Sequence, residues 1–274
     1  MNREIIKKAV QMSLEEDVGE RDVTIQLISA CKFVKTVVVA QGDAVVCGIP
    51  WFEMVYHQID PEVEIGWDLH EGDCISNGQL LAELKGKARS ILTGERMALN
   101  WLQTLSGTAT LVRRYIEELK TTKVQLLDTR KTIPCMRYAQ KYAVRFGGGK
   151  NHRMGLYDAF LIKENHIMSC VSITEAIQKA RSCCPEKLVE IEVENLKELQ
   201  EALEAKADVI MLDNFDIDSI KEAVSISSGM VKLEVSGNVN LQNIQEIAKT
   251  GIDFISVGAI TKNLSAIDFS MRIS

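Results

Sequence analysis

The sequence predicts an α/β protein with two differently built regions. Residues 1–100 combine β-branched runs with Gly, Asn and Asp turns, as antiparallel sheets do. Beyond residue 122 the chain repeats a strand, a polar strand end and a helix, which indicates a parallel sheet. The polar residues follow the same end of every predicted strand. This placement favours a barrel with functional groups around one mouth over a doubly wound sheet.

Size and composition exclude several classes of protein. A chain of 274 residues with 46% hydrophobic content can bury a full core. Its net charge of -6 argues against general nucleic-acid binding. The seven cysteines are odd in number and form no C-x-x-C pair, so we expect reduced thiols, with neither a disulfide framework nor a zinc site. Without a signal-peptide core or an apolar run of membrane-spanning length, we expect a cytoplasmic protein with no membrane contact.

The first region is predicted to be α+β. Apolar residues at helical spacing indicate helices, and runs of β-branched residues with glycine punctuation indicate strands. The last helical stretch is interrupted near Ser106 and Gly107, which predicts a pair of helices. The expected elements are a helix at 2–16, strands within 33–48, a helix at 50–59, antiparallel strands within 62–86 and the helix pair at 88–119.

The second region is predicted to consist of six βα units. Only six strands are evident, so an eight-stranded barrel would need strands that the pattern does not show. The strands are expected at 124–128, 159–165, 188–195, 207–214, 231–238 and 253–259, with helices within 173–183, 196–205, 216–226 and 241–251.

A basic segment stands out against the acidic whole. Residues 128–166 hold eight Lys or Arg against three acids. The run GGGKNHR within it fits neither a dinucleotide fingerprint nor a P-loop, and its glycines could simply form a tight turn. Lys150, His152 and Arg153 follow at once, however, and such donors suit carboxylates. The cluster therefore indicates a small anionic ligand.

An acidic group is predicted to face the same mouth. In LVEIEVEN, Glu190, Glu192 and Glu194 alternate, so a strand would point all three to one side. Their repulsion requires cations or a metal, and Lys131, Lys163 and Arg153 are candidates to balance them. Structural ion pairing is the favoured interpretation of Glu190 itself.

Glycines follow the last two predicted strands, in the sequences SGN and VGA. They leave backbone N–H groups free to approach a ligand, and the final loops of such barrels often bind phosphate. The residue chemistry therefore predicts a site for a polyanionic small molecule on the basic side, a Mg²⁺-bound diphosphate near the acids and a phosphate on the glycine loops.

Six motifs follow one another along the chain. They are ERMALNWLQTLSGTATL, LDTRKTIPCMRYAQKYAVRFGGGKNHRMGLYDAFLIKENHI, EIEVEN, IMLDNF, LEVSGN and ISVGAIT. In order and spacing they resemble the quinolinate phosphoribosyltransferase family, the decarboxylating nicotinate-nucleotide pyrophosphorylases. The resemblance implies an N-terminal α/β sandwich domain over residues 1–110, joined by the tail 266–274, followed by an incomplete, about seven-stranded parallel α/β barrel over 111–265. It also implies a homodimer in which one N-terminal domain covers the partner's barrel mouth.

The family's reaction joins quinolinate to 5-phosphoribosyl-1-pyrophosphate with Mg²⁺ and releases pyrophosphate and CO₂, giving nicotinate mononucleotide for NAD biosynthesis. By resemblance, Lys131, Glu192 and Asp213 would be catalytic, with Glu192 and Asp213 also on the metal side, partly through water or substrate. The substrate-binding residues would be Arg96 from the partner subunit, Arg130, Lys131, His152, Arg153, Lys163, Glu192, Asp213, Ser236, Gly237 and Gly258.

The chain departs from the family pattern at two places. Thr132-Ile133-Pro134-Cys135 stands where the family shows TTPG, and Lys262 stands where a histidine is common. Two alternatives remain open: a related protein of molybdenum transport systems and a non-catalytic barrel that binds a phosphorylated metabolite. The complete set of cationic residues favours the transferase over both.

Overall fold

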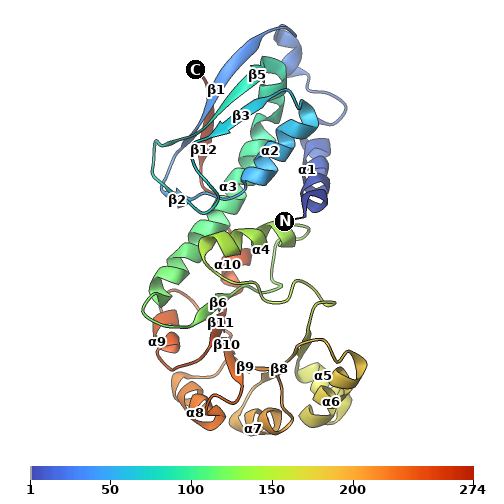
Figure 1. The fold of residues 1–274 in the computed structure, drawn as a ribbon, viewed down its shortest axis with the longest axis vertical. Coiled ribbons are helices and arrows are strands. Elements are labelled where there is room, and N and C mark those ends of the chain that lie inside the picture. Colours follow the sequence, from blue (N-terminus) through green and yellow to red (C-terminus); the bar gives the residue numbers. More distant parts are fainter. Residues whose placement is uncertain (1) are drawn as a thin grey trace. The chain divides into compact units, whose positions relative to one another are not determined.

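The structure, a computed structural model, describes residues 2–274 and divides into two compact units (Figure 1). The first unit comprises the residues up to Arg113 together with Ile133–Gly148 and Asn263–Ser274, and the second comprises Arg114–Thr132 and Gly149–Lys262. Each of these units combines segments that are separate in the sequence, whereas the predicted domains were nearly continuous ranges of the chain. The domain boundaries at 110 and 265 therefore stay a prediction.

The first unit is built on a four-stranded antiparallel sheet. Its order is β12-β1-β5-β3, so the carboxyl-terminal strand pairs with the first long strand of the chain. Alternate residues of β1 are buried, as expected for a sheet with one face on the core. The strands are β1 (Phe33–Ala40), β3 (Glu64–Trp67), β5 (Leu80–Lys87) and β12 (Phe269–Ile273), with a separate two-stranded ribbon of β2 (Ala44–Val45) and β4 (Cys74–Ile75).

Helices cover this sheet and share its apolar core. The Trp51 ring lies 6.0 Å from that of Trp101 and 5.0 Å from that of Tyr142, which joins three helices through aromatic contacts. The core also buries Leu81 and Leu84 of the sheet. The helices are α1 (Arg3–Val18), the 3-10 helix η1 (Thr24–Leu27), α2 (Ile49–Ile59), α3 (Ala88–Leu119) and α4 (Arg137–Gly147).

The predicted helix pair at 88–119 is wrong, because α3 runs unbroken through Ser106 and Gly107. These small residues serve packing. A Cβ atom on Gly107 would lie 2.2 Å from the backbone oxygen of Ser265, and the Ser106 hydroxyl donates to the Cys47 carbonyl at 3.1 Å. Close contact with neighbouring backbone therefore selects the small residues that propensity alone interprets as a break.

The second unit holds a six-stranded parallel sheet in the order β6-β11-β10-β9-β8-β7. Its helices follow the strands and lie outside their arc (Figure 1), as right-handed βα connections require. The mixed α/β class and the partial parallel barrel are thus confirmed. The strands are β6 (Gln125–Leu127), β7 (Phe160–Ile162), β8 (Val189–Val193), β9 (Val209–Asp213), β10 (Lys232–Ser236) and β11 (Phe254–Ser256).

Two features of the helices in this unit differ from the prediction. The strand expected at 159–165 is shorter, because helix α5 begins at Glu164. A final short helix follows the last strand. The helices are α5 (Glu164–Cys170), α6 (Ile173–Cys183), α7 (Leu196–Glu204), α8 (Ile217–Ser227), α9 (Ile244–Ala248) and α10 (Ala259–Lys262).

A rudimentary seventh strand borders β6, where Lys150 forms a parallel bridge with Leu127. The glycines before it serve local structure. Gly148 ends helix α4 with φ 103°, a left-handed conformation that favours glycine. A Cβ atom on Gly147 would lie 2.5 Å from that of Val112. Gly148 is therefore explained by the turn that ends α4, and Gly147 by close packing against Val112.

Across residues 2–274, the helices are all too short or too polar to cross a membrane.

Candidate active site

A cavity of about 570 Å³ opens at the carboxyl ends of the parallel strands in the second unit. This is the edge at which an α/β barrel gathers side chains from several strands. Of the predicted site residues, those that line the cavity are Arg130, Lys131, His152, Arg153, Lys163, Glu192, Asp213, Ser236 and Gly237. The structure therefore brings together residues that lie more than 100 positions apart in the chain.

Two predicted residues do not line this cavity. Gly258 lies beside it, since a Cβ atom there would be 3.0 Å from Cδ of Lys131. Arg96 lies on α3 in the first unit, and its role at the site stays a prediction. The functional roles of all these residues likewise stay predictions, because the geometry shows where they are and not what they bind.

The loop after β6 is held so that Arg130 and Lys131 lie at the mouth. The Lys131 backbone N–H donates to Oγ1 of Thr129 at 3.0 Å, and the Thr261 hydroxyl donates to the Lys131 carbonyl at 2.7 Å. These bonds join the strand end of β6 to the start of α10. The basic pair is thus fixed by backbone contacts that leave its side chains to face the cavity.

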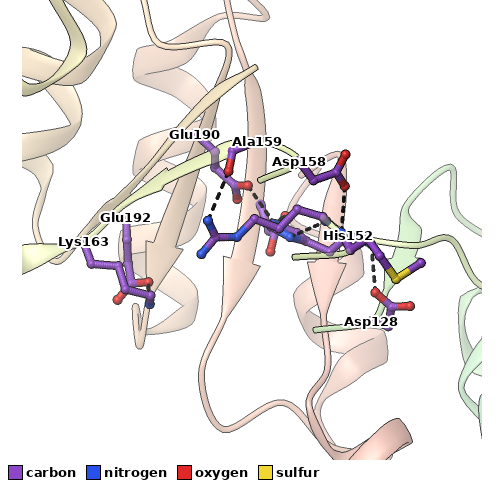
Figure 2. Close-up of polar contacts among 10 residues, drawn as sticks. Asp128, His152, Asp158, Ala159, Lys163, Glu190 and Glu192 are labelled. Carbon is purple, nitrogen blue, oxygen red and sulfur yellow. Dashed lines mark hydrogen bonds and ion pairs between the residues drawn. The ribbon is translucent and has the colours of Figure 1, made fainter. Parts of the chain in front are cut away.

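A buried carboxylate fixes the neighbouring segment. Asp128 is 0% exposed, and its Oδ1 accepts from the His152 backbone N–H at 2.9 Å. Its Oδ2 accepts from the Asn151 side chain at 2.6 Å, and Lys150 continues the bridge to β6. The carboxylate therefore holds the residues that lead to His152 and Arg153 (Figure 2).

The basic side of the cavity concentrates positive charge where water is scarce. Burial lowers the pKa of Arg153, and the charge of Arg130 lowers it further. One Arg153 Nη atom donates to the Ala159 carbonyl at 3.1 Å, whereas its buried Nε has no hydrogen-bond partner among residues 2–274. Two repelling guanidinium groups with an unused donor suit an anion, and planar guanidinium suits carboxylate in particular.

The acidic side lies on the neighbouring strands β8 and β9. Glu192 pairs with Lys163, and the two side chains lie together in Figure 2. Burial raises the pKa of Asp213, and the nearby charge of Glu192 raises it further, while Lys163 and Lys131 act in the opposite direction. The Asn214 side chain orients Asp213 by donating to its Oδ2 at 2.9 Å.

These acids fit a magnesium ion. Mg²⁺ prefers oxygen ligands and takes one or two carboxylates together with substrate phosphates and water. The mutual repulsion that raises the pKa of Asp213 would be relieved by a cation shared with Glu192. The donor set therefore suits the metal that the sequence implies.

The phosphate side is shaped by a close contact between two strand ends. Gly237 has φ 93°, and a Cβ atom on it would lie 2.2 Å from Oδ1 of Asn214. The same Asn214 oxygen accepts from the Asn238 side chain at 3.3 Å. Any larger residue at 237 would displace Asn214, which itself orients Asp213. Glycine here leaves space and backbone for a ligand, as expected for a phosphate loop.

The floor of the cavity is formed by groups that the sequence analysis did not select. Glu234 and Ser256 line the cavity, and Glu190 lies 2.7 Å from His152 through its Oε2. Burial, followed by the charge of Glu190, raises the pKa of Glu234 well above its ordinary value. The signal was available, because Glu234 lies two residues before Ser236 and so shares its face of the strand.

The two departures from the family pattern fall outside this cavity lining. Cys135 adopts φ 63°, a left-handed conformation that glycine takes without strain. Lys262 is exposed at the end of α10. Neither departure removes a group that lines the cavity.

Comparison with known proteins gives a consistent result over the whole chain. Residues 22–106 match the family model "Quinolinate phosphoribosyl transferase, N-terminal domain", and residues 108–272 match "Quinolinate phosphoribosyl transferase, C-terminal domain". A probable nicotinate-nucleotide pyrophosphorylase [carboxylating] of Bacillus subtilis is 37% identical over 100% of this chain and 95% of its own length. A quinolinate phosphoribosyltransferase [decarboxylating] of Nicotiana tabacum is 35% identical over 98% of this chain and 82% of its own.

A solved structure agrees with these matches. The nicotinate-nucleotide pyrophosphorylase from Francisella tularensis is 47% identical and covers 100% of this chain and 98% of its own, with a TM-score of 0.98. The similarity thus extends over both units and includes every segment that contributes to the cavity.

Replacing Glu234 by glutamine tests the buried acid. The raised pKa means that the folded chain keeps a proton that the unfolded chain releases above about pH 4.3. The associated stability is fully present below that value and is lost as pH rises towards the raised pKa, by up to about 1.4 kcal/mol per pH unit. We expect Glu234→Gln to flatten this loss in urea unfolding measured from about pH 4.3 upwards.

The matched control is Glu222→Gln, at an exposed position on α8, which should leave the pH profile unchanged. A Glu234→Gln profile as steep as that of the wild-type chain would mean that Glu234 is ionised in the fold.

Proposed function

Because the chain belongs to the quinolinate phosphoribosyltransferase family, we infer that it transfers the phosphoribosyl group of 5-phosphoribosyl-1-pyrophosphate to quinolinate with decarboxylation. The products are nicotinate mononucleotide, pyrophosphate and CO₂, and the reaction is a step of de novo NAD biosynthesis. The observation that carries this inference is the single cavity that joins a cationic side to an acidic side and a glycine turn. Full-length similarity to proteins named for this activity supports it.

The cationic side fits quinolinate, a small aromatic diacid. Arg130, Arg153 and Lys163 border one part of the cavity, and guanidinium groups bind carboxylates through two parallel hydrogen bonds. The unfilled Nε of Arg153 and its closeness to Arg130 favour an anion at this place. We assign these three side chains to the two carboxylates, with Lys131 between this part and the ribose.

The opposite side fits the phosphoribosyl donor. Glu192 and Asp213 would hold Mg²⁺, which when bound neutralises the diphosphate leaving group. Departure of pyrophosphate leaves positive charge on the ribose, and the same carboxylates can stabilise that charge. Ser236 and Gly237 would hold the terminal phosphate, with Gly258 beside Lys131.

Decarboxylation needs little further help from the protein. Ribosylation makes the ring nitrogen cationic, so the electrons left by CO₂ are neutralised within the ring. The chain's part is to orient the two substrates and to exclude water. No covalent bond to the protein is required, and Cys135 is not proposed as a nucleophile.

The direct test combines the purified chain with quinolinate, 5-phosphoribosyl-1-pyrophosphate and Mg²⁺. We expect nicotinate mononucleotide and CO₂ in equal amounts, because both arise from one turnover. A chelator should abolish product formation and added Mg²⁺ should restore it, since the diphosphate would otherwise repel Glu192 and Asp213. Failure to form either product would reject the proposed function.

Replacing Arg130 by alanine tests the carboxylate side. A hydrogen bond between charged groups contributes about 2 kcal/mol, so we expect the quinolinate KM to rise roughly 30-fold or turnover to disappear. The thermal midpoint should remain close to that of the wild-type chain. Arg114→Ala, at an exposed position of the second unit, is the control and should change neither quantity. A large loss of thermal stability in Arg130→Ala would instead make Arg130 structural.

We also propose that the enzyme is a homodimer in which Arg96 completes the partner's site. Arg96→Ala and Arg130→Ala should each be inactive alone, because each removes a guanidinium from every site. Mixed dimers should recover activity, since one site would combine an intact Arg130 with an intact Arg96. Sedimentation of the active enzyme as a monomer would contradict the shared site.

The proposed location is the cytoplasm, where seven unpaired cysteines would stay reduced. Recovery of the protein only from an extracytoplasmic fraction would contradict this.

A further inference from the structure

Cys183 and Cys184 are adjacent in the sequence, and their sulfur atoms lie 3.9 Å apart at the end of helix α6. Neighbouring side chains on a helix point in different directions, so two adjacent cysteines within one do not normally meet. Here the helix ends between them. Pro185 follows Cys184 and disfavours a helical conformation at that residue. Cys184 accordingly leaves the helix with φ -142° and ψ 82°, and its thiol donates to the sulfur of Cys183.

Backbone contacts hold this turn on both sides. The Cys184 N–H donates to the Ala180 carbonyl at 3.0 Å, and the Lys187 N–H donates to the Cys184 carbonyl at 3.1 Å. Cys183 is exposed and Cys184 is partly exposed, so a reagent in solution reaches both thiols. The hydrogen bond to Cys183 raises the pKa of the Cys184 thiol, and partial loss of water raises it further. The turn therefore presents an accessible dithiol.

A disulfide between these two cysteines is disfavoured by the backbone. Adjacent Cα atoms lie about 3.8 Å apart across a trans peptide bond, whereas ordinary disulfides need a separation of about 4.4 Å or more. Closing the bond would strain the turn and make the disulfide easy to reduce. The pair should therefore stay reduced wherever single thiols stay reduced.

A divalent metal ion is also a poor occupant. Structural zinc sites use four protein ligands, and the group of three possible ligands found among residues 2–274 contains neither cysteine. A centre that needs only two bonds to the protein avoids this shortage. Trivalent arsenic is such a centre, because it bonds covalently to sulfur and keeps a third substituent of its own. Bonds of about 2.3 Å that meet at about 100° set two sulfur atoms about 3.5 Å apart. The observed 3.9 Å is close to that separation.

A cavity of about 400 Å³ beside the pair has room for an organic substituent on the arsenic. Cys183 lines this cavity. Leu156, Phe160 and Ala176 give it apolar walls. An aromatic ring attached to arsenic would leave water on entering the cavity, which favours an aryl arsenical over the inorganic acid.

We propose that Cys183 and Cys184 form a chelating site for trivalent arsenic, with an aryl substituent held in the adjacent apolar cavity. In the reaction with phenylarsine oxide, two S–H bonds and the bonds between arsenic and the oxide oxygen break, and two arsenic–sulfur bonds form. The two thiol protons leave with the oxide oxygen as one molecule of water. Arsenic stays trivalent, so no oxidant or reductant takes part. Neither cysteine lines the active-site cavity, and the proposal does not depend on the proposed function.

Titration of the full chain with phenylarsine oxide in an excess of a monothiol tests the site. Single cysteines release arsenic to the monothiol, whereas a chelating pair retains it because the second bond forms within one molecule. We expect one phenylarsenic group per chain by intact mass, with the loss of two hydrogens, and its release by 2,3-dimercaptopropanol. A wild-type chain that retains no arsenic would overturn the proposal.

Two substitutions and a control locate the arsenic. Cys183→Ser and Cys184→Ser each leave one thiol of the pair and exchange a single atom. Each should raise the concentration needed for half-saturation about 100-fold or more, because chelation is lost. Cys31→Ser removes an exposed cysteine that has no cysteine beside it in the sequence, and it should leave binding unchanged. Wild-type binding by either variant at the turn would overturn the proposal, as would a loss in Cys31→Ser.

Cys170 lines the same cavity and is the alternative partner for Cys183. Cys170→Ser should retain full binding, since two bonds from the adjacent pair are enough. A loss of binding in this variant would assign the arsenic to Cys170 and Cys183 and overturn chelation by the adjacent pair.

The wild-type chain decides where a variant fails to fold. After treatment with phenylarsine oxide, an alkylating reagent should spare Cys183 and Cys184 together and modify the other exposed cysteines, as peptide masses would show. Alkylation of either cysteine of the pair in the arsenic-treated chain would overturn the proposal.

Discussion

The site depends on holding like charges together at one strand edge. Two unit charges about 5 Å apart repel by about 3 kcal/mol at an effective dielectric constant of about 20. The lowered pKa of Arg153 beside Arg130, and the raised pKa of Asp213 beside Glu192, are the local signs of this repulsion. The two halves relieve each other only in part: Glu192 pairs with Lys163, and the charges of Lys163 and Lys131 act against the raised pKa of Asp213. Each half therefore gains from a ligand of opposite charge.

The scaffold resists relaxation of this arrangement through backbone contacts. Parallel pairing sets Ser236 opposite Asp213 and Glu192 opposite Met211, so register fixes where each strand end lies. Asp128 holds the segment before Arg153, and Asn214 fills the space above Gly237. If these contacts loosened, the like charges would move apart and the affinity for a ligand would fall. The affinity for a ligand therefore depends on the rigidity of this strand edge.

The sequence predicted the features that follow from hydrophobic periodicity and from the polar residues at strand ends. Strands with charges at their carboxyl ends placed Arg130, Lys163, Glu192 and Asp213 at one mouth, and the cavity confirms that they gather there. The sequence did not predict the unbroken helix α3. Gly107 is needed there because a side chain would collide with the backbone of Ser265, which is distant in the chain. Glu234 was missed because it lies within its strand and not at the strand end, although its position two residues before Ser236 placed it on the same face. Its closeness to Glu190 and His152 becomes visible only after folding.

The floor of the cavity is subject to the same electrostatic constraint. Burial, followed by the charge of Arg130, lowers the pKa of Arg153, and the charge of Glu190 acts in the opposite direction. Burial, followed by the charge of Glu190, raises the pKa of Glu234, which limits the negative charge that the floor can carry. The protein therefore balances the positive charge of Arg130 and Arg153 only in part, and a diacid would supply the missing negative charge.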